Sequence, residues 1–174
     1  TKEVEKFYTK FHKNVPIVNT NHQTSEMVKY ANNSFLATKI SFINQIATIC
    51  EAISGVNVDT VAETIGLDPR IGNRFLTAGP GYGGSCLPKD VKAIINFSNK
   101  YKIKPALLNA VEEINQQQLE NIMNGIKKKV GKIKNKKITI LGLAFKADTD
   151  DIRDSISIKL IELLLKKGAK IIAH

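Results

Sequence analysis

One stretch carries most of the chemistry in this chain: Gly79-Pro80-Gly81-Tyr82-Gly83-Gly84-Ser85-Cys86-Leu87-Pro88-Lys89-Asp90. Its four glycines allow the backbone to adopt positive φ and to approach a ligand without a Cβ clash. Pro88 predicts a helix start, because proline is favoured at the first helical position. Cys86 then lies just before a helix N-terminus and near Lys89, and both features stabilise a thiolate. Asp90 falls in the first helical turn, where it can serve as a base near the sulfur.

A second interpretation of the same residues is purely structural. The glycines would form a turn, and Cys86 would be one of the many thiols that are buried and inert. The helix start and the neighbouring lysine favour a nucleophilic Cys86, but the residues alone leave both interpretations open.

Residues 79–90 resemble the active-site loop of the UDP-glucose 6-dehydrogenase family, the NAD-dependent nucleotide-sugar dehydrogenases. That family carries the pattern G-x-G-(F/Y)-G-G-S-C-x-x-K-D, which the stretch matches position by position. The resemblance implies that Cys86 attacks a sugar aldehyde and carries the thiohemiacetal and thioester intermediates. It also implies that Tyr82, Gly83 and Leu87 contact the substrate, UDP-glucose, and that the cofactor is NAD.

A long apolar helical pattern precedes this stretch, from about Ser25 to Ser54, with Thr24 or Ser25 as its predicted cap. Its apolar residues lie on more than one face, which predicts burial on several sides. Lys29 and Asn33 lie four residues apart and so share a face, where they could hold an oxyanion or form a solvated polar edge. The family has a K-x-x-x-N pair here, and the resemblance implies that both residues hold the substrate oxygen.

The segment Asp-Pro-Arg-Ile-Gly-Asn-Arg-Phe-Leu, residues 68–76, would otherwise contain ordinary surface cations. It resembles the family's R-I-G-x-x-F-L pattern, which implies that Phe75 contacts substrate. The resemblance also implies that Arg70 reaches the sugar bound by the neighbouring subunit, a role that suits the planar guanidinium fork. The chain departs from the family at Gln45, where many members have Glu, and we expect this to cost packing or a polar contact rather than activity.

The second half of the chain changes from helical to alternating structure. Helices are predicted over residues 91–100 and from Pro105 to about 130, followed by a β-rich run at 137–141. A helix from about Ser155 to Lys167 and a strand at 170–173 complete a βαβ unit, which predicts parallel strands. The predicted fold class is therefore mainly α: a helical domain over residues 1–135, then an incomplete Rossmann-like α/β unit over 136–174.

The loop after the first strand is where βαβ units bind nucleotides. Residues 141–155 resemble the family's G-L-A-F-K-x-x-T-D-D-x-R-x-S motif. Phe145 and Lys146 are therefore implied to contact the nucleotide sugar, and Arg153, together with Lys89, to face NAD. Without the resemblance, Lys146 and Arg153 would be exposed loop cations.

Composition limits the other function classes. The net charge of +10 invites nucleic-acid binding, but the lysines are spread along the chain apart from seven between Lys127 and Lys137. That cluster contains no aromatic residue to stack on bases, and it follows a helix end whose dipole attracts cations. No apolar run reaches the roughly 18 residues that span a bilayer. Two cysteines make no disulfide framework, so we expect a cytoplasmic protein without a metal site, bound to neither nucleic acid nor membrane.

The predicted function is oxidation of C6 of UDP-glucose to UDP-glucuronate by two NAD⁺. Lys29 and Asn33 would stabilise the oxyanion, and Asp90 would position or deprotonate the hydrolytic water. The resemblance covers a central dimerisation domain and a truncated UDP-binding domain, so we expect a fragment that is inactive alone. Two alternatives stay open: a sister enzyme acting on GDP-mannose or a UDP-N-acetyl sugar, and a non-catalytic helical dimerisation module.

A homodimer is expected because the long helix is apolar around more than one face. A chain of this length has few other elements to cover those faces, and a large exposed apolar patch is usually an interface. The residues concerned are Phe35, Leu36, Ile40, Phe42, Ile43, Ile46 and Ile49.

Overall fold

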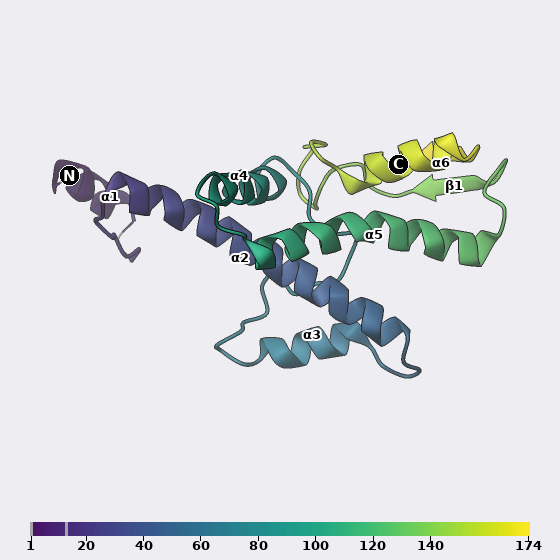
Figure 1. Cartoon of the computed structure of the whole chain (residues 1–174), viewed down its shortest axis with the longest axis horizontal. Helices are drawn as coiled ribbons and strands as arrows, with labels where there is room; N and C mark the ends of the chain where they lie inside the picture. Colours follow the sequence, from purple (N-terminus) through teal and green to yellow (C-terminus); the bar gives the residue numbers. More distant parts are fainter. Residues whose placement is uncertain (1, 13) are drawn as a thin grey trace.

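The computed structural model describes residues 2–12 and 14–174. Six helices and two strands follow one another in this part of the chain (Figure 1). They are α1 (Lys2–Phe11), α2 (His22–Glu51), α3 (Val58–Gly66), α4 (Leu87–Lys100), α5 (Ala106–Val130), β1 (Lys137–Ile140), α6 (Ile156–Lys166) and β2 (Lys170–Ala173). The predicted fold class, mainly helical with an incomplete Rossmann-like unit at the end, is confirmed.

The ends of α2 differ from the prediction. Its N-cap is Asn21, whose backbone is extended and whose side chain accepts a hydrogen bond from the Thr24 amide at 2.8 Å. The prediction of Thr24 or Ser25 as cap was wrong, because asparagine caps a helix as well as serine does and stands one turn earlier. The helix ends at Glu51, and the chain then turns through Gly55, which has a φ of +82°.

Three helices pack on α2. Figure 1 shows α4 and α5 on one side of the long helix and α3 on the other. Small residues allow the close approach of α5: Ala37 is fully buried, and the Ser41 hydroxyl donates to the Val111 carbonyl at 2.9 Å. Ile43 is also fully buried and packs with Ala62 of α3. The buried surface of α2 therefore joins the whole helical part.

The βαβ unit is attached to the far half of α5. The strands are parallel, with Lys137 opposite Lys170, as the sequence predicts. Met123 of α5 packs with Leu160 and Leu164 of α6 in one apolar cluster. Since the first half of α5 packs on α2, this helix contacts both the helical part and the βαβ unit.

One face of α2 stays apolar and exposed. Val28, Phe35, Phe42 and Ile49 follow one another at seven-residue spacing, and their exposed fractions are 60%, 65%, 47% and 52%. Seven-residue spacing places side chains along one side of a helix. Within residues 2–12 and 14–174, no helix combines the length and apolar character needed to cross a membrane.

Candidate active site

Cys86 lies at the helix start that the sequence predicts. It is the N-cap residue of α4, and its carbonyl accepts the first helical hydrogen bond from the Asp90 amide at 3.0 Å. Pro88 stands in the first helical positions. Both cysteines are free thiols, but Cys86 is exposed whereas Cys50 is buried in α2. Of the two, only Cys86 is open to a substrate.

The polar edge of α2 meets the first turn of α4 at Asp90. This carboxylate is only 3% exposed, and it accepts two hydrogen bonds. Asn33 Nδ2 donates to Oδ2 at 2.6 Å, and Lys89 Nζ donates to Oδ1 at 2.7 Å. Asp90 therefore contacts two other predicted site residues: its neighbour Lys89, and Asn33 from a distant segment of the chain.

The charge of Asp90 is stabilised despite its burial. Burial is the largest single influence and acts to raise its pKa. Hydrogen bonds from Lys89 and Asn33, together with the positive charges of Lys89 and Lys29, outweigh it and hold the pKa below the ordinary value. Asp90 is therefore an oriented anion at neutral pH, and Lys29 lies close enough to act on it.

Two exposed cations lie within electrostatic range of Cys86. The pKa of Lys89 is raised, first by its hydrogen bond to Asp90 and, among smaller influences, by its electrostatic interaction with Cys86. The pKa of Arg153 is raised, first by its hydrogen bond to Asp151 and, more weakly, by Cys86. The fold thus brings the predicted cofactor-facing cations, Lys89 and Arg153, to the cysteine from two different segments.

Residues 79–86 form the cysteine loop, and two of its glycines, Gly83 and Gly84, are needed because the loop after β1 packs directly on them. A Cβ on Gly84 would lie 2.6 Å from the Phe145 ring, and Gly84 has a φ of +81°. A Cβ on Gly83 would overlap the Asp154 carbonyl oxygen. Lys146 Nζ lies 5.6 Å from the centre of the Phe145 ring, so both predicted sugar contacts from this loop stand beside the cysteine loop.

Three polar side chains that sequence reasoning missed hold the cysteine loop. Asn44 of α2 accepts a hydrogen bond from the Gly79 amide at 2.7 Å, while Asn115 and Glu112 of α5 bind Tyr82. Tyr82, which we expected against the substrate, is 3% exposed, and its hydroxyl donates to Glu112 at 3.0 Å. The available signal was the presence of asparagines inside apolar helical patterns.

The predicted cross-subunit residue lies in a separate turn. Arg70 is exposed and pairs with Asp68 at 2.6 Å. Lys39 of α2 supports this turn, since its ammonium donates to the carbonyls of Ile71 at 3.0 Å and Gly72 at 3.1 Å. In the part of the chain that the structure describes, no hydrogen bond or ion pair joins Arg70 to Cys86, Asn33 or Asp90.

Two other predicted substrate contacts differ in exposure. Phe75 is 42% exposed and has a φ of +65°, an uncommon backbone for an aromatic residue. Leu87 is half-buried against the cluster of Ala37 and Val91.

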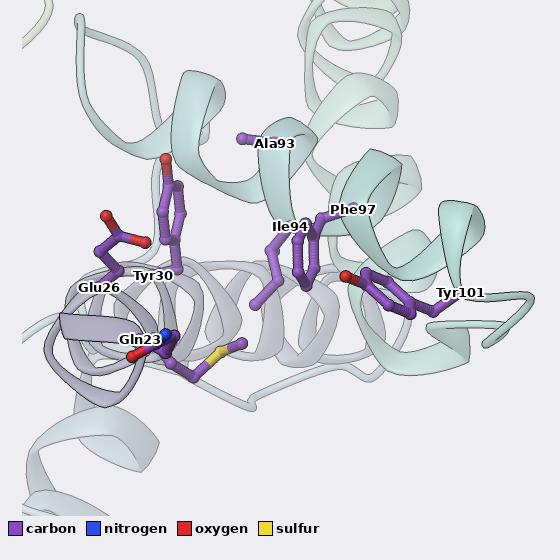
Figure 2. A pocket seen from close by; sticks show the side chains of 8 residues that line it. Gln23, Glu26, Tyr30, Ala93, Ile94, Phe97 and Tyr101 are labelled. Atoms are coloured by element: carbon purple, nitrogen blue, oxygen red, sulfur yellow. The ribbon is translucent and has the colours of Figure 1, made fainter. Parts of the chain in front are cut away.

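An apolar groove lies next to this site but does not include it. Figure 2 shows Glu26 and Tyr30 of α2 on one side of the groove, and Ile94 and Phe97 of α4 together with Tyr101, which directly follows α4, on the other. None of the residues predicted to bind substrate or cofactor lines it. The candidate site is instead the open surface where the cysteine loop, the Lys29–Asn33 edge and the loop after β1 meet.

Comparison with known proteins gives two family matches. The model of the UDP-glucose/GDP-mannose dehydrogenase family, central domain, matches residues 23–117, and that of the family's UDP binding domain matches residues 139–174. The two matches cover the helical part and the βαβ unit of this chain. The chain belongs to the UDP-glucose/GDP-mannose dehydrogenase family.

Named relatives span different lineages. UDP-glucose 6-dehydrogenase TuaD of Bacillus subtilis is 43% identical over 171 residues, which is 98% of this chain and 36% of the relative. UDP-glucose 6-dehydrogenase AglM of Haloferax volcanii is 46% identical over 161 residues, 92% of this chain and 37% of the relative. The chain thus spans just over a third of the length of these relatives.

A solved structure supports the fold. The UDP-glucose dehydrogenase of Pyrobaculum islandicum superimposes with a TM-score of 0.91 at 35% identity, over 100% of this chain and 40% of that one. The UDP-D-ManNAc dehydrogenase of Pyrococcus horikoshii superimposes with a TM-score of 0.84 at 30% identity, over 99% and 40%.

Gly84→Ala is expected to destabilise the chain by about 1–3 kcal/mol, because alanine is strained at this positive φ and its methyl group meets Phe145. Gly79→Ala is the matched control, since a Cβ there has no atom within 4 Å. Urea unfolding followed by circular dichroism measures both variants. Equal stability of the two would contradict the direct packing of Phe145 on the cysteine loop.

Asp90→Asn is expected to cost about 1–3 kcal/mol at pH 7, because the amide presents an N–H group to donors that the carboxylate had satisfied. The lowered pKa of Asp90 means that its stabilisation is present above the ordinary value of 3.8 and is lost as pH falls through the native value. The stability difference from the unaltered chain should therefore shrink between pH 7 and pH 3. Asp150→Asn, at an exposed position, is the control, and a pH-independent effect of Asp90→Asn would disprove the ionised state.

Proposed function

We propose that this chain supplies the nucleophile, the oxyanion-binding groups and part of the nucleotide-sugar surface of an NAD-dependent UDP-glucose 6-dehydrogenase. The observation that carries the proposal is the convergence of Cys86, the Asn33–Asp90 pair and Phe145 from three distant segments. The names of the relatives favour UDP-glucose as the substrate. The reaction would convert C6 of the glucose from an alcohol to a carboxylate.

In this proposal Cys86 acts after the alcohol has become an aldehyde. NAD supplies the acceptor for each of the two hydrides. The Cys86 sulfur adds to the aldehyde carbon and forms a thiohemiacetal, which loses the second hydride to become a thioester. Water then attacks the acyl carbon, the C–S bond breaks, and the carboxylate and the free thiol are released. Holding the aldehyde covalently keeps it from leaving between the two oxidations.

The neighbouring polar groups suit the charges that develop. The Asn33 amide has two N–H donors, and Asp90 engages one of them, which leaves the other for the substrate oxygen. Lys29 adds a positive charge at the same edge, as expected for oxyanion stabilisation. Ionised Asp90 can accept a proton from the attacking water.

The remaining parts of the proposal concern nucleotide, cofactor and location. The loop after β1 stands at the carboxyl end of the strand, where parallel units bind nucleotides, so Phe145 and Lys146 would contact the UDP-sugar. Lys89 and Arg153 are exposed cations beside Cys86 and suit the anionic cofactor. Residues up to about 135 would form the dimerisation domain, and later ones would belong to the UDP-binding domain.

The proposed location is the cytoplasm, because a nucleophilic thiol suits a reducing compartment.

Cys86→Ser in the complete enzyme is expected to lower NADH formation from UDP-glucose below about 1% of the unaltered rate, because an alcohol is a far weaker nucleophile at neutral pH. Binding of UDP-glucose should stay within several-fold. Cys50→Ala is the control, since Cys50 is buried in α2. Unchanged turnover in Cys86→Ser would remove covalent catalysis, whereas faster turnover of GDP-mannose or a UDP-N-acetyl sugar would identify a sister enzyme.

We also propose that two copies of the chain pair through the exposed stripe on α2 formed by Val28, Phe35, Phe42 and Ile49. An apolar stripe of this kind is usually an interface, and a twofold dimer is the commonest way to cover one. Arg70 would then be free to reach the partner's substrate, as the family resemblance implies.

Sedimentation equilibrium at micromolar concentration is expected to give twice the chain mass of 19.2 kDa. Phe35→Asp should shift the equilibrium to single chains, because it places a charge in the apolar stripe. Phe97→Asp is the control, since Phe97 is similarly exposed but belongs to α4. A single-chain mass for the unaltered protein would rule out both the dimer and the role of Arg70 across it.

A further inference from the structure

Asn115 of α5 binds both backbone groups of a residue in the cysteine loop. The Tyr82 amide donates to Asn115 Oδ1 at 2.7 Å, and Asn115 Nδ2 donates to the Tyr82 carbonyl at 3.1 Å. In a β-sheet, the N–H and C=O groups of one residue can both be hydrogen-bonded to a neighbouring strand. Here a single side chain forms both hydrogen bonds with a residue of a loop. The position of Tyr82 relative to α5 is therefore determined by two hydrogen bonds.

Glu112, one helical turn before Asn115, holds the side chain of the same tyrosine. The buried Tyr82 hydroxyl donates to Glu112 Oε2 at 3.0 Å. The other carboxylate oxygen of Glu112 accepts from Gln116 at 3.0 Å and lies 3.6 Å from the Lys92 ammonium in α4. Glu112 thus contacts the chain on both sides of Cys86: four residues before it and six residues after it.

The loop is in close contact both with α5 and with the loop after β1. A Cβ on Gly81 would overlap Asn115 Oδ1, while Phe145 and the Asp154 carbonyl pack against Gly84 and Gly83. In the described part of the chain, the Cys86 sulfur itself has one hydrogen-bonding contact, with Ser85 Oγ at 3.7 Å. The place of the sulfur therefore depends on how the backbone of the loop is held.

We propose that Asn115 and Glu112 are positioning residues that determine where the Cys86 sulfur lies at the start of α4. Neither side chain contacts the sulfur; each acts through Tyr82. The inference rests on the proposed role of Cys86 as nucleophile, because a thiolate that adds to a carbonyl must be held within a narrow range of positions. It assigns to α5 a part in the reaction beyond packing on α2.

The test is the rate at which iodoacetamide alkylates each cysteine of the 174-residue chain, measured by mass spectrometry. In the unaltered chain Cys86 should react faster than Cys50. Glu112→Leu and Asn115→Leu should each slow Cys86 by about threefold or more, because the sulfur no longer stays at the helix start beside Lys89. Glu112→Gln keeps an acceptor for the tyrosine hydroxyl and should restore the rate.

A double substitution distinguishes positioning through Tyr82 from a general loss of structure. Tyr82→Phe removes the hydroxyl and should slow Cys86 by itself, but should add nothing in the Glu112→Leu background if both changes break one hydrogen bond. Independent, additive effects would overturn the proposed route. Cys50 reports on folding, since it becomes reactive only when α2 opens.

The outcomes separate this inference from the proposed function. If Cys86 of the unaltered chain reacts no faster than Cys50, the nucleophile proposal fails. If it reacts faster and the Leu variants match or exceed its rate with Cys50 still protected, the positioning role is overturned. If a Leu variant makes Cys50 reactive, that variant has lost structure, and the smaller changes Asn115→Asp and Tyr82→Phe are tested in its place. An unchanged rate of Cys86 alkylation in both of these variants refutes the positioning role.

Discussion

The absence of side chains at Gly83 and Gly84 is the constraint on which the candidate site depends. Because there is no Cβ at these positions, the Phe145 ring and the Asp154 carbonyl pack against the backbone of the cysteine loop. This contact brings a loop of the βαβ unit to a loop of the helical part. The proposed nucleotide-sugar surface and the thiol would therefore belong to one site, although they come from opposite halves of the chain.

Electrostatics complements this packing. Burial alone would favour a neutral Asp90, but hydrogen bonds from Lys89 and Asn33 and the nearby lysine charges keep it ionised. The same contacts join α2 to α4, so an anion that the proposed chemistry uses also stabilises the helix packing. Lys29, Lys89 and Arg153 also lie within electrostatic range of Asp90 or Cys86, and these cations suit the proposed nucleotide sugar and cofactor, both of which are anionic.

The sequence predicted the features that depend on neighbours along the chain. Pro88 after a glycine run was enough to place Cys86 at a helix start, and the change of periodicity near residue 136 was enough to predict parallel strands. The error at the start of α2 has a similar local origin. Asn21, Thr24 and Ser25 are all good caps, and local preference does not distinguish between them, whereas the backbone conformation of Asn21 does.

The local arrangement of reactive groups can be predicted from the sequence: a thiol at a helix start, a lysine and an asparagine on one helical face, and a loop after a parallel strand. The exposure of the thiol, and the groups that hold this arrangement in place, depend on how distant segments pack. Asn44, Glu112 and Asn115 were not among the residues predicted for the site, yet they bind the cysteine loop. The reason is that a polar residue on a helix shows the same periodicity whether its hydrogen-bond partner is water or a distant loop. The packing of α2 and α5 against the cysteine loop determines which of the two partners it has.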